Sequence, residues 1–296
     1  TGVHLQTMLD GGAYGSYGVA STLYTGALQT VTYKLPTYKF DGARTFTNKP
    51  PCGPKRGHGT PQPRFGQEVQ LDKIAVALGL DPANIRLQQL AEAGSLTANF
   101  MRLGTIGLKE CIEKVVDGSG WKERRGKLGY GRGLGIACSS YLCGAGLPIY
   151  WNELPHSGVQ LRLDRSGGVT AFCGATEVGQ GSDDVLALCV AEVLGIDPFD
   201  VRVVTGDTDL GPVDLGSYSS RVTLMMGNAA IQAAERARAM IAISVSKKLG
   251  VPEDRLVFAD RRVFDAQDPS VGMAWRDAVL PGEAQHGTLG TVGPYT

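Results

Sequence analysis

A short glycine loop between a predicted strand and a predicted helix holds the residues best suited to binding an anion. The loop covers residues 175–184 and contains Gly179, Gln180 and Gly181, followed by Ser182. The first amides of a helix lack partners within the helix, and the helix dipole favours negative charge there. The carboxamide of Gln180 adds a donor and an acceptor. Because short glycine motifs are weak signals, a plain turn in which Ser182 caps the helix is the competing interpretation.

A second candidate for anion binding lies directly before the longest helical pattern in the chain, residues 222–249. It combines three serine hydroxyls with a tyrosine and an arginine: Ser217, Tyr218, Ser219, Ser220 and Arg221. Hydroxyls, free amides and a guanidinium at one helix start suit a phosphate or a pyrophosphate. The alternative is a serine cap beside a solvent-facing arginine. Two such helix starts in one half of the chain favour a ligand with more than one anionic or polar centre.

A long loop rich in proline and glycine covers residues 48–63, where we expect neither a helix nor a central strand. Within it Arg56 is followed by Gly57, so a ligand can approach both the guanidinium and the nearby backbone amides. Long ordered loops often carry function. A solvated basic loop is the competing interpretation.

The elements that must position these loops alternate between strands and helices. We expect strands over residues 4–9, 27–33, 159–163, 169–173, 201–204, 255–258 and 262–264, and a small-residue strand and turn over 131–143. We expect helices over residues 65–78, 82–90, 104–116, 185–194, 222–249 and 273–279, followed by a tail without a closing element. This mixture is typical of an α+β architecture. A charged, glycine-rich stretch after residue 117 places the domain boundary there, which gives subdomains 1–117 and 118–296.

The composition excludes several classes of function. The 296 residues include 29 basic and 29 acidic residues, so no general attraction to nucleic acid or to an anionic membrane is expected. No apolar run approaches the roughly 20 residues that cross a bilayer. The six cysteines form no C-x-x-C pair and the four histidines have no ligand spacing, which argues against a zinc or iron–sulfur site made by this chain. We expect a soluble, reduced, cytoplasmic protein.

Three motifs, taken together in their order along the chain, resemble the molybdenum-binding large subunits of the xanthine oxidase family. Residues 55–62 are similar to that family's R-G-F-G-G-P-Q loop, with His58 in place of an aromatic residue. Residues 176–181 are similar to its G-Q-G loop, and residues 206–221 contain the third motif. The resemblance implies an α+β fold with two molybdopterin-binding subdomains of mixed sheets and flanking helices. Three segments look most like the α subunit of 4-hydroxybenzoyl-CoA reductase: residues 50–59, 138–143 and 217–221.

The cofactor implied by this resemblance is molybdopterin cytosine dinucleotide, whose dithiolene binds the molybdenum, so that this chain supplies no metal ligand. The backbone around Arg56 and Gly57 would face the oxo or hydroxo ligands of the metal. Residues 179–182 would hold the pterin and its phosphates, and residues 217–221 would bind the dinucleotide end. Iron–sulfur clusters and FAD would lie on an iron–sulfur subunit and a flavin subunit of a hetero-oligomer.

The implied activity is that of a molybdenum-dependent oxidoreductase. The subgroup resemblance predicts reductive dehydroxylation of 4-hydroxybenzoyl-CoA to benzoyl-CoA in anaerobic aromatic degradation, with an aromatic acyl-CoA as substrate and a ferredoxin-like electron donor. The alternative is a molybdenum hydroxylase that acts on an aldehyde or an N-heterocycle. A third hypothesis is a non-catalytic domain that binds a nucleotide or phosphate through the same helix starts.

The sequence departs from the family pattern in three respects. The family's glutamate base would lie beyond residue 296, and its early glutamine loop would lie before residue 1, so the catalytic residue is not identified here. An arginine frequent in hydroxylating members is absent from residues 24–28, which disfavours ordinary purine hydroxylation. We therefore expect the middle part of a longer subunit, inactive when expressed alone.

Overall fold

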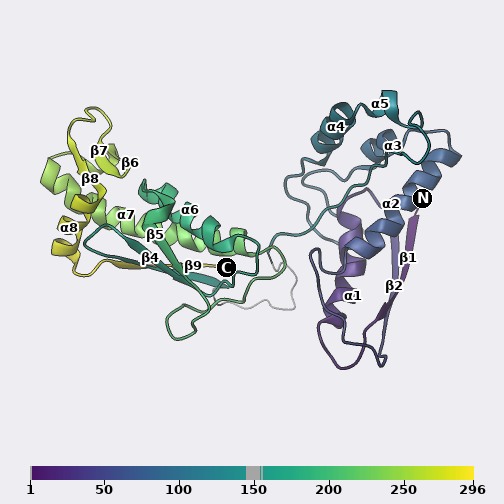
Figure 1. Cartoon of the computed structure of the whole chain (residues 1–296), viewed down its shortest axis with the longest axis horizontal. Coiled ribbons are helices and arrows are strands. Elements are labelled where there is room, and N and C mark those ends of the chain that lie inside the picture. The colour runs from purple at the N-terminus through teal and green to yellow at the C-terminus, as the bar shows by residue number, and fades with distance from the viewer. Residues whose placement is uncertain (1, 145–153, 155) are drawn as a thin grey trace. The chain divides into compact units, whose positions relative to one another are not determined.

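The computed structural model describes residues 2–144, 154 and 156–296, and the chain divides into two compact units (Figure 1). The first unit is Thr1–Tyr141 and the second is Leu142–Thr296. Each unit is described by itself below.

The division falls later than the boundary expected after residue 117. Residues 118–141 pack with the first unit because their apolar side chains complete its core. Trp121 and Cys138 are buried against Tyr33, Ala83 and Ile112. Although this stretch is rich in charged residues, its few apolar side chains pack against the preceding helices.

The first unit combines a small parallel sheet with helices. In order, its described elements are β1 (Gly2–Asp10), α1 (Gly18–Ala27), the 3-10 helix η1 (Leu28–Val31), β2 (Thr37–Thr45), α2 (Pro61–Ala77), α3 (Pro82–Gln89), α4 (Leu108–Ser119) and α5 (Trp121–Arg124). Strands β1 and β2 pair in parallel along their whole lengths and lie side by side in Figure 1. Parallel strands cannot be joined by a tight turn, so the chain crosses back through α1, which contacts both of them.

Two glycines allow α1 and β2 to come this close. A Cβ atom at Gly26 of α1 would lie 2.2 Å from the Phe40 ring, and one at Gly42 of β2 would lie 2.5 Å from the same ring. The Phe40 side chain is therefore held between the helix and the strand, with room for no larger residue at either position.

Two predictions for the first unit are wrong. Residues 27–33 were expected to form a strand, but they end α1 and form η1. The side chains of Leu28, Gln29, Thr30 and Val31 are all buried, so their apparent alternation does not mark a half-exposed strand surface. Residues 131–143 form no strand; the apolar side chains in this stretch pack on the helical core instead of extending a sheet.

The second unit is built on a mixed sheet of four strands in the order β5-β4-β3-β9 and a smaller sheet in the order β6-β7-β8. Its described strands are β3 (Ser157–Leu163), β4 (Val169–Cys173), β5 (Val201–Val204), β6 (Leu256–Ala259), β7 (Arg262–Asp265), β8 (Gly272–Ala274) and β9 (Gly290–Tyr295). Its helices are α6 (Ser182–Leu194), η3 (Pro198–Asp200), the π-helix η4 (Val222–Met226), α7 (Gly227–Leu249), η5 (Glu253–Arg255) and α8 (Trp275–His286). The expected β3–β4 hairpin is confirmed. The prediction of a tail without a closing element is wrong, because β9 joins the large sheet beside β3.

Helix α7 packs closely on the large sheet because it presents small residues to it. A Cβ atom at Gly293 of β9 would lie 2.0 Å from the backbone oxygen of Ala229. The residues of this close-packed face are all buried: Ala229, Ala230, Ala233, Ala234 and Ala237. This packing holds the sheet and α7 together. The candidate loop at residues 175–182 follows β4, and the one at residues 217–221 precedes η4 and α7.

Two general features of the described residues bear on function. No helix among them is long and apolar enough to cross a membrane. All six cysteines are free thiols, and the described residues contain no cluster of three or more His, Cys, Asp or Glu side chains that could hold a metal ion.

Candidate functional site

The loop between β4 and α6 folds around the carboxylate of Glu177. One carboxylate oxygen, Oε1, accepts hydrogen bonds from the backbone N–H groups of Gly179 at 2.6 Å and Gly181 at 3.1 Å. The other, Oε2, accepts from the Ser182 hydroxyl at 3.2 Å and the Asp183 N–H at 3.3 Å. We predicted from the sequence that the amides at this helix start are free for a ligand. In the structure the Glu177 carboxylate accepts hydrogen bonds from several of them.

The Gln180 side chain is also bonded within the loop. Its Oε1 accepts from the N–H of Val178 at 2.6 Å, and its Nε2 donates to the Thr176 carbonyl and the Ser182 hydroxyl, both at 2.9 Å. Gln180 therefore fixes the shape of the loop while its surface stays exposed. Its contact with a ligand stays a prediction.

We expect protonation of Glu177 to loosen this loop. Desolvation raises the pKa of Glu177, but hydrogen bonds from the N–H groups of Gly181, Asp183 and Gly179 outweigh it and lower the pKa to about 2. The ionised form is thus favoured by folding, so its stabilisation is complete above the ordinary pKa near 4.5 and is lost as the pH falls through about 2. Hydrogen-exchange protection of these three amides should decrease over that range.

The matched variant for this prediction is Glu177→Gln, which cannot ionise. It should show weaker protection of the same amides at neutral pH and no acid-dependent step beyond that of the rest of the unit. Equal protection in the two proteins from pH 7 to pH 2.5 would contradict the role given to the carboxylate.

Arg221 lies beneath the second candidate loop, with its guanidinium turned towards protein atoms. Its Nη1 donates to Asp214 Oδ1 and to the Gly216 carbonyl, both at 2.8 Å. Its Nη2 donates to the His156 carbonyl at 2.7 Å and to the Ser157 hydroxyl at 2.8 Å. The side chains of Arg221 and Asp214 are both fully buried. The solvent-facing alternative is therefore wrong. Arg221 stabilises the loop through these bonds, and its predicted contact with a phosphate stays a prediction.

Two consecutive serines in this loop adopt the left-handed backbone conformation. The φ angles of Ser219 and Ser220 are 49° and 53°. Such conformations cost non-glycine residues on the order of 1–3 kcal/mol each and are concentrated at functional sites. The Ser219 hydroxyl is buried without a hydrogen-bond partner among the described residues, and Ser220 is exposed. Asp214 Oδ2 and Arg221 Nε in the same loop are also buried without partners among the described residues, so the strained turn is one of the places where the fold leaves polar atoms unbonded.

The two candidate loops are neighbours in the folded unit. The backbone N–H of Thr176 donates to the Ser217 hydroxyl at 2.8 Å, although the two residues are 41 positions apart. The structure thus brings residues 176–182 and 217–221 together, as two helix starts serving one ligand require.

His58 anchors the proline-rich loop of the first unit on α1. Its Nε2 lies 3.1 Å from the Ser21 hydroxyl, and its ring centroid lies 5.3 Å from that of Tyr17 and 4.7 Å from that of Tyr24. Burial lowers the pKa of His58, so the ring is neutral at physiological pH. A Cβ atom at Gly59 would lie 2.3 Å from the Ser21 carbonyl oxygen. His58 therefore occupies an aromatic site, as expected for the position where the family has an aromatic residue.

Arg56 and Gly57 lie at the exposed end of the same loop. Thr60 closes the turn by donating its N–H and its hydroxyl to the Gly57 carbonyl, at 2.9 and 2.5 Å. Gly57 has a φ of 95°, and Arg56 is exposed. These two residues belong to the first unit and the other predicted site residues to the second, so their place at one common site stays a prediction.

Sequence reasoning missed the acidic residues that organise the site. Glu177 was not expected to cap α6, and Asp214 was not expected to pair with Arg221. The available signals were weak: an acidic residue shortly before a glycine turn, and an aspartate seven positions before an arginine.

Comparison with protein families assigns the chain. Residues 113–296 match a family model described as a molybdopterin cofactor-binding domain, and residues 1–90 match a second model of the same description. The chain belongs to the molybdopterin cofactor-binding domains of the xanthine oxidase family. The longer match contains both loops of the second unit.

Curated relatives of this chain include subunits of dehydrogenases and hydroxylases. The domain is 36% identical over 227 residues to the putative xanthine dehydrogenase molybdenum-binding subunit XdhA of Escherichia coli (strain K12), covering 74% of this chain and 30% of that protein. It is 26% identical over 294 residues to the nicotine 6-hydroxylase large subunit of Paenarthrobacter nicotinovorans, covering 93% of this chain and 36% of that protein. The chain thus spans about a third of the length of these relatives.

The fold is that of solved structures in the family. Quinoline 2-oxidoreductase from Pseudomonas putida 86 matches 99% of this chain and 40% of its own chain, with a TM-score of 0.80 and 23% sequence identity. This likeness confirms the predicted α+β fold of the molybdopterin-binding type.

Proposed function

We propose that this domain is part of the molybdenum-containing subunit of an oxidoreductase of the xanthine dehydrogenase and aldehyde oxidoreductase type. The observation that carries the proposal is the junction of the two loops at Thr176 and Ser217, inside the segment that matches the molybdopterin cofactor-binding domain. The bound cofactor supplies two-electron and oxygen-transfer chemistry, and the domain's own residues bind and orient it.

The strained turn at Ser219 and Ser220 has polar groups that suit the phosphates of a molybdopterin cofactor. Ser219 offers a buried hydroxyl that no described protein atom bonds, and the adjacent Ser220 is exposed. We propose that residues 217–220 hold the phosphates of the dinucleotide end, in the molybdopterin cytosine dinucleotide form of the cofactor. The exposed surface of Gly179, Gln180 and Gly181 would border the pterin, with Ser182 behind it.

Arg221 and Glu177 have supporting parts in this proposal. Most of their charged atoms are bonded to the protein, so we propose that they set the positions of the donors, while Arg221 Nε has no hydrogen-bond partner among the described residues. The backbone around Arg56 and Gly57 would face the oxygen ligands of the metal. A partner iron–sulfur subunit and a flavin subunit would carry the electrons, in a cytoplasmic hetero-oligomer.

Hydroxylation of an N-heterocycle or an aldehyde is the reaction best supported. The two curated relatives are named for xanthine and nicotine, which are both N-heterocycles. Reductive dehydroxylation of 4-hydroxybenzoyl-CoA with a ferredoxin-like donor stays a second candidate, supported only by the motif resemblance at residues 50–59, 138–143 and 217–221.

Metal and nucleotide content tests the proposal before any substrate is known. We expect the purified complete enzyme to contain molybdenum in a ratio near one per subunit, measured by plasma mass spectrometry, and to release cytosine nucleotide on acid treatment. Absence of molybdenum together with bound free nucleotide would instead identify a plain nucleotide-binding domain.

Turnover then separates the two reactions. We expect oxidation of N-heterocycles or aldehydes with an artificial electron acceptor, and no benzoyl-CoA from 4-hydroxybenzoyl-CoA with a reduced low-potential donor. The reverse pattern in a molybdenum-loaded enzyme would keep the cofactor assignment and overturn the hydroxylase.

A further inference from the structure

The charged stretch that follows α4 carries a local excess of positive charge. Residues 122–132, called the basic segment below, contain five basic residues and one acidic residue, Glu123. The basic residues are Lys122, Arg124, Arg125, Lys127 and Arg132. The first unit as a whole has 17 basic and 10 acidic residues, so this segment supplies more than half of the unit's excess of basic residues. None of the residues assigned to the cofactor above lies in this segment.

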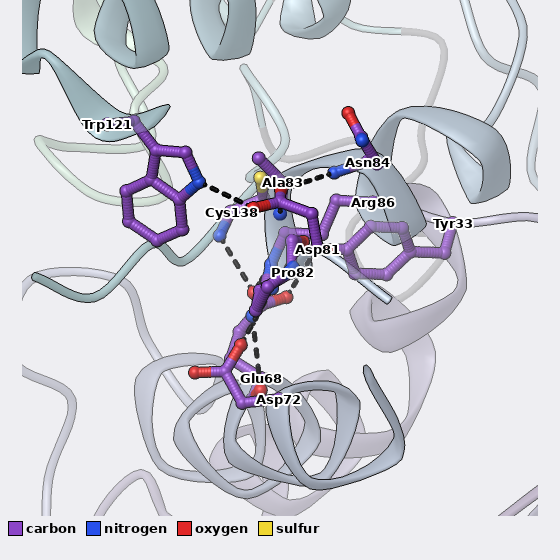
Figure 2. A network of polar contacts seen from close by, with 10 residues as sticks. All are labelled: Tyr33, Glu68, Asp72, Asp81, Pro82, Ala83, Asn84, Arg86, Trp121 and Cys138. Atoms are coloured by element: carbon purple, nitrogen blue, oxygen red, sulfur yellow. Dashed lines mark hydrogen bonds and ion pairs between the residues drawn. The ribbon is translucent and has the colours of Figure 1, made fainter. Parts of the chain in front are cut away.

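The fold holds the basic segment in place at both ends. Before it, Nε1 of Trp121 donates to Asp81 Oδ2 at 2.9 Å (Figure 2). After it, the Cys138 N–H donates to Glu68 Oε2 at 3.0 Å. Two turns inside the segment are closed by backbone hydrogen bonds of 3.1 Å, from residue 127 to residue 124 and from residue 132 to residue 129. The side chains are therefore presented on an ordered backbone, which reduces the entropy lost when a partner binds.

Three of the five cations have no partner of opposite charge among the described residues. Arg124 donates to the Ser119 carbonyl at 2.8 Å, and the Arg125 guanidinium lies 5.2 Å from the centroid of the Trp121 ring. The other three are exposed and form no ion pair within the described part of the chain: Lys122, Lys127 and Arg132.

Lysines on the neighbouring helix α4 are paired, although they are well exposed. Lys114 lies 2.8 Å from Glu110 and Lys109 lies 3.9 Å from Glu113, and both lysine side chains are 75% exposed. Such pairs four residues apart balance the charges of a solvated helix surface. The basic segment lacks this balance, and it adds the fully exposed side chain of Tyr130. Tyrosine and arginine are enriched at the centres of protein–protein interfaces.

We propose that the basic segment is the docking surface for an acidic protein surface on a partner subunit of the complete enzyme. Carboxylates of that subunit would pair with Lys122, Lys127 and Arg132, around a contact with Tyr130. Surfaces that bind anionic lipid carry clusters of about four to eight basic residues, and only three are free here. The inference rests on the hetero-oligomer proposed above and is independent of its substrate.

Zero-length cross-linking of the purified complete enzyme tests this docking surface. A carbodiimide joins a lysine amine only to a carboxylate in direct contact with it, and peptide mapping by mass spectrometry identifies both ends. We expect Lys122 or Lys127 to be joined to an aspartate or glutamate of another subunit. Lys109 and Lys114 are the matched control, and we expect their links to stay within α4.

Every other result of that experiment overturns the inference. Links from Lys122 and Lys127 only to carboxylates of this chain, in the same copy or in a second one, identify a different contact. The absence of any link at these two lysines shows a solvated surface. The molybdenum content of the same sample shows separately whether the proposed function holds.

Charge removal provides a second measurement, made by analytical ultracentrifugation. In the triple variant Lys122→Gln, Lys127→Gln, Arg132→Gln, we expect the dissociation constant of the partner subunit to rise about tenfold at low salt, because three exposed ion pairs are lost. The difference should disappear at about 1 M salt, where charges are screened beyond about 3 Å. All three positions are exposed, so the variant should fold normally.

The control for charge removal is the variant Lys109→Gln with Lys114→Gln, which should bind the partner subunit as the unchanged enzyme does. Equal dissociation of the triple variant and the unchanged enzyme at low salt would overturn the inference. Binding to phosphatidylserine vesicles that the triple variant alone loses would overturn it as well, because the segment would then serve an anionic membrane.

Discussion

Arg221→Met is expected to lower the free energy of unfolding of the second unit by about 3–5 kcal/mol, because it leaves the buried Asp214 carboxylate without its counter-charge. Both side chains are fully buried, and the guanidinium also holds Gly216, His156 and Ser157. A loss of this size exceeds the 1.5–3 kcal/mol or so expected for one charge-assisted hydrogen bond to a ligand phosphate. Denaturant unfolding measures the change, followed by the fluorescence of Trp275 in a background in which Trp121 and Trp151 are replaced by phenylalanine.

The control for this prediction is Arg261→Met. Arg261 forms an exposed ion pair with Asp200 at 2.7 Å, and exposed pairs contribute only about 0–1 kcal/mol. The double variant Asp214→Asn with Arg221→Met removes both buried charges and should recover part of the loss. A stable Arg221→Met protein that has merely lost molybdenum would show that the arginine binds the cofactor directly.

Glu68→Ala is expected to destabilise the first unit by about 3 kcal/mol, because it removes the acceptor of three buried hydrogen bonds, although Arg86 keeps its ion pair with Asp72 at 2.8 Å. Figure 2 shows the Glu68 carboxylate at the centre of a polar network. It accepts from the Tyr33 hydroxyl at 2.6 Å, from Arg86 Nε at 2.7 Å and from the Cys138 N–H at 3.0 Å. Burial and this carboxylate raise the pKa of Tyr33 well above its usual range, so the phenol remains a donor at all physiological pH values.

The segment around Cys138 gives this prediction a local readout. Glu68 is its polar link to α2, so Glu68→Ala should free the buried Cys138 thiol and accelerate its reaction with a thiol reagent, located by peptide mapping. Glu110→Ala is the matched control, since Glu110 forms only an exposed pair with Lys114 on α4. Unchanged Cys138 labelling and unchanged unfolding in Glu68→Ala would show that the network is dispensable.

Sequence reasoning found many of the regular elements but missed α1, β2 and β9, and the place of the site stays a prediction. The spacing of apolar residues in α2 and the alternation in β3 and β4 follow from one buried face, so their prediction needed no knowledge of the tertiary fold. The prediction of a strand at residues 27–33 was wrong because every residue of η1 is buried. Periodicity analysis needs a contrast between buried and exposed positions, and η1 offers none.

The chemistry inside the site could be predicted only in part. Residue types located the two loops, and the structure joins them at Thr176 and Ser217. The roles of Arg221 and Glu177 were not accessible, because they depend on which way each side chain turns. Partners of Arg221 lie up to 65 residues away, and the capping by Glu177 depends on the path of a glycine turn.

The parallel pairing of β1 and β2 has a consequence for how the first unit folds. A hairpin can close locally, but these strands meet only after α1 has reversed the chain between them, and Phe40 fits only when α1 and β2 are both in place. Closing such a loop costs entropy before its contacts compensate, so this pair forms more slowly than the local contacts of α2, α3 and α4. We therefore expect the pairing of β1 with β2 to be a late step in the folding of the first unit.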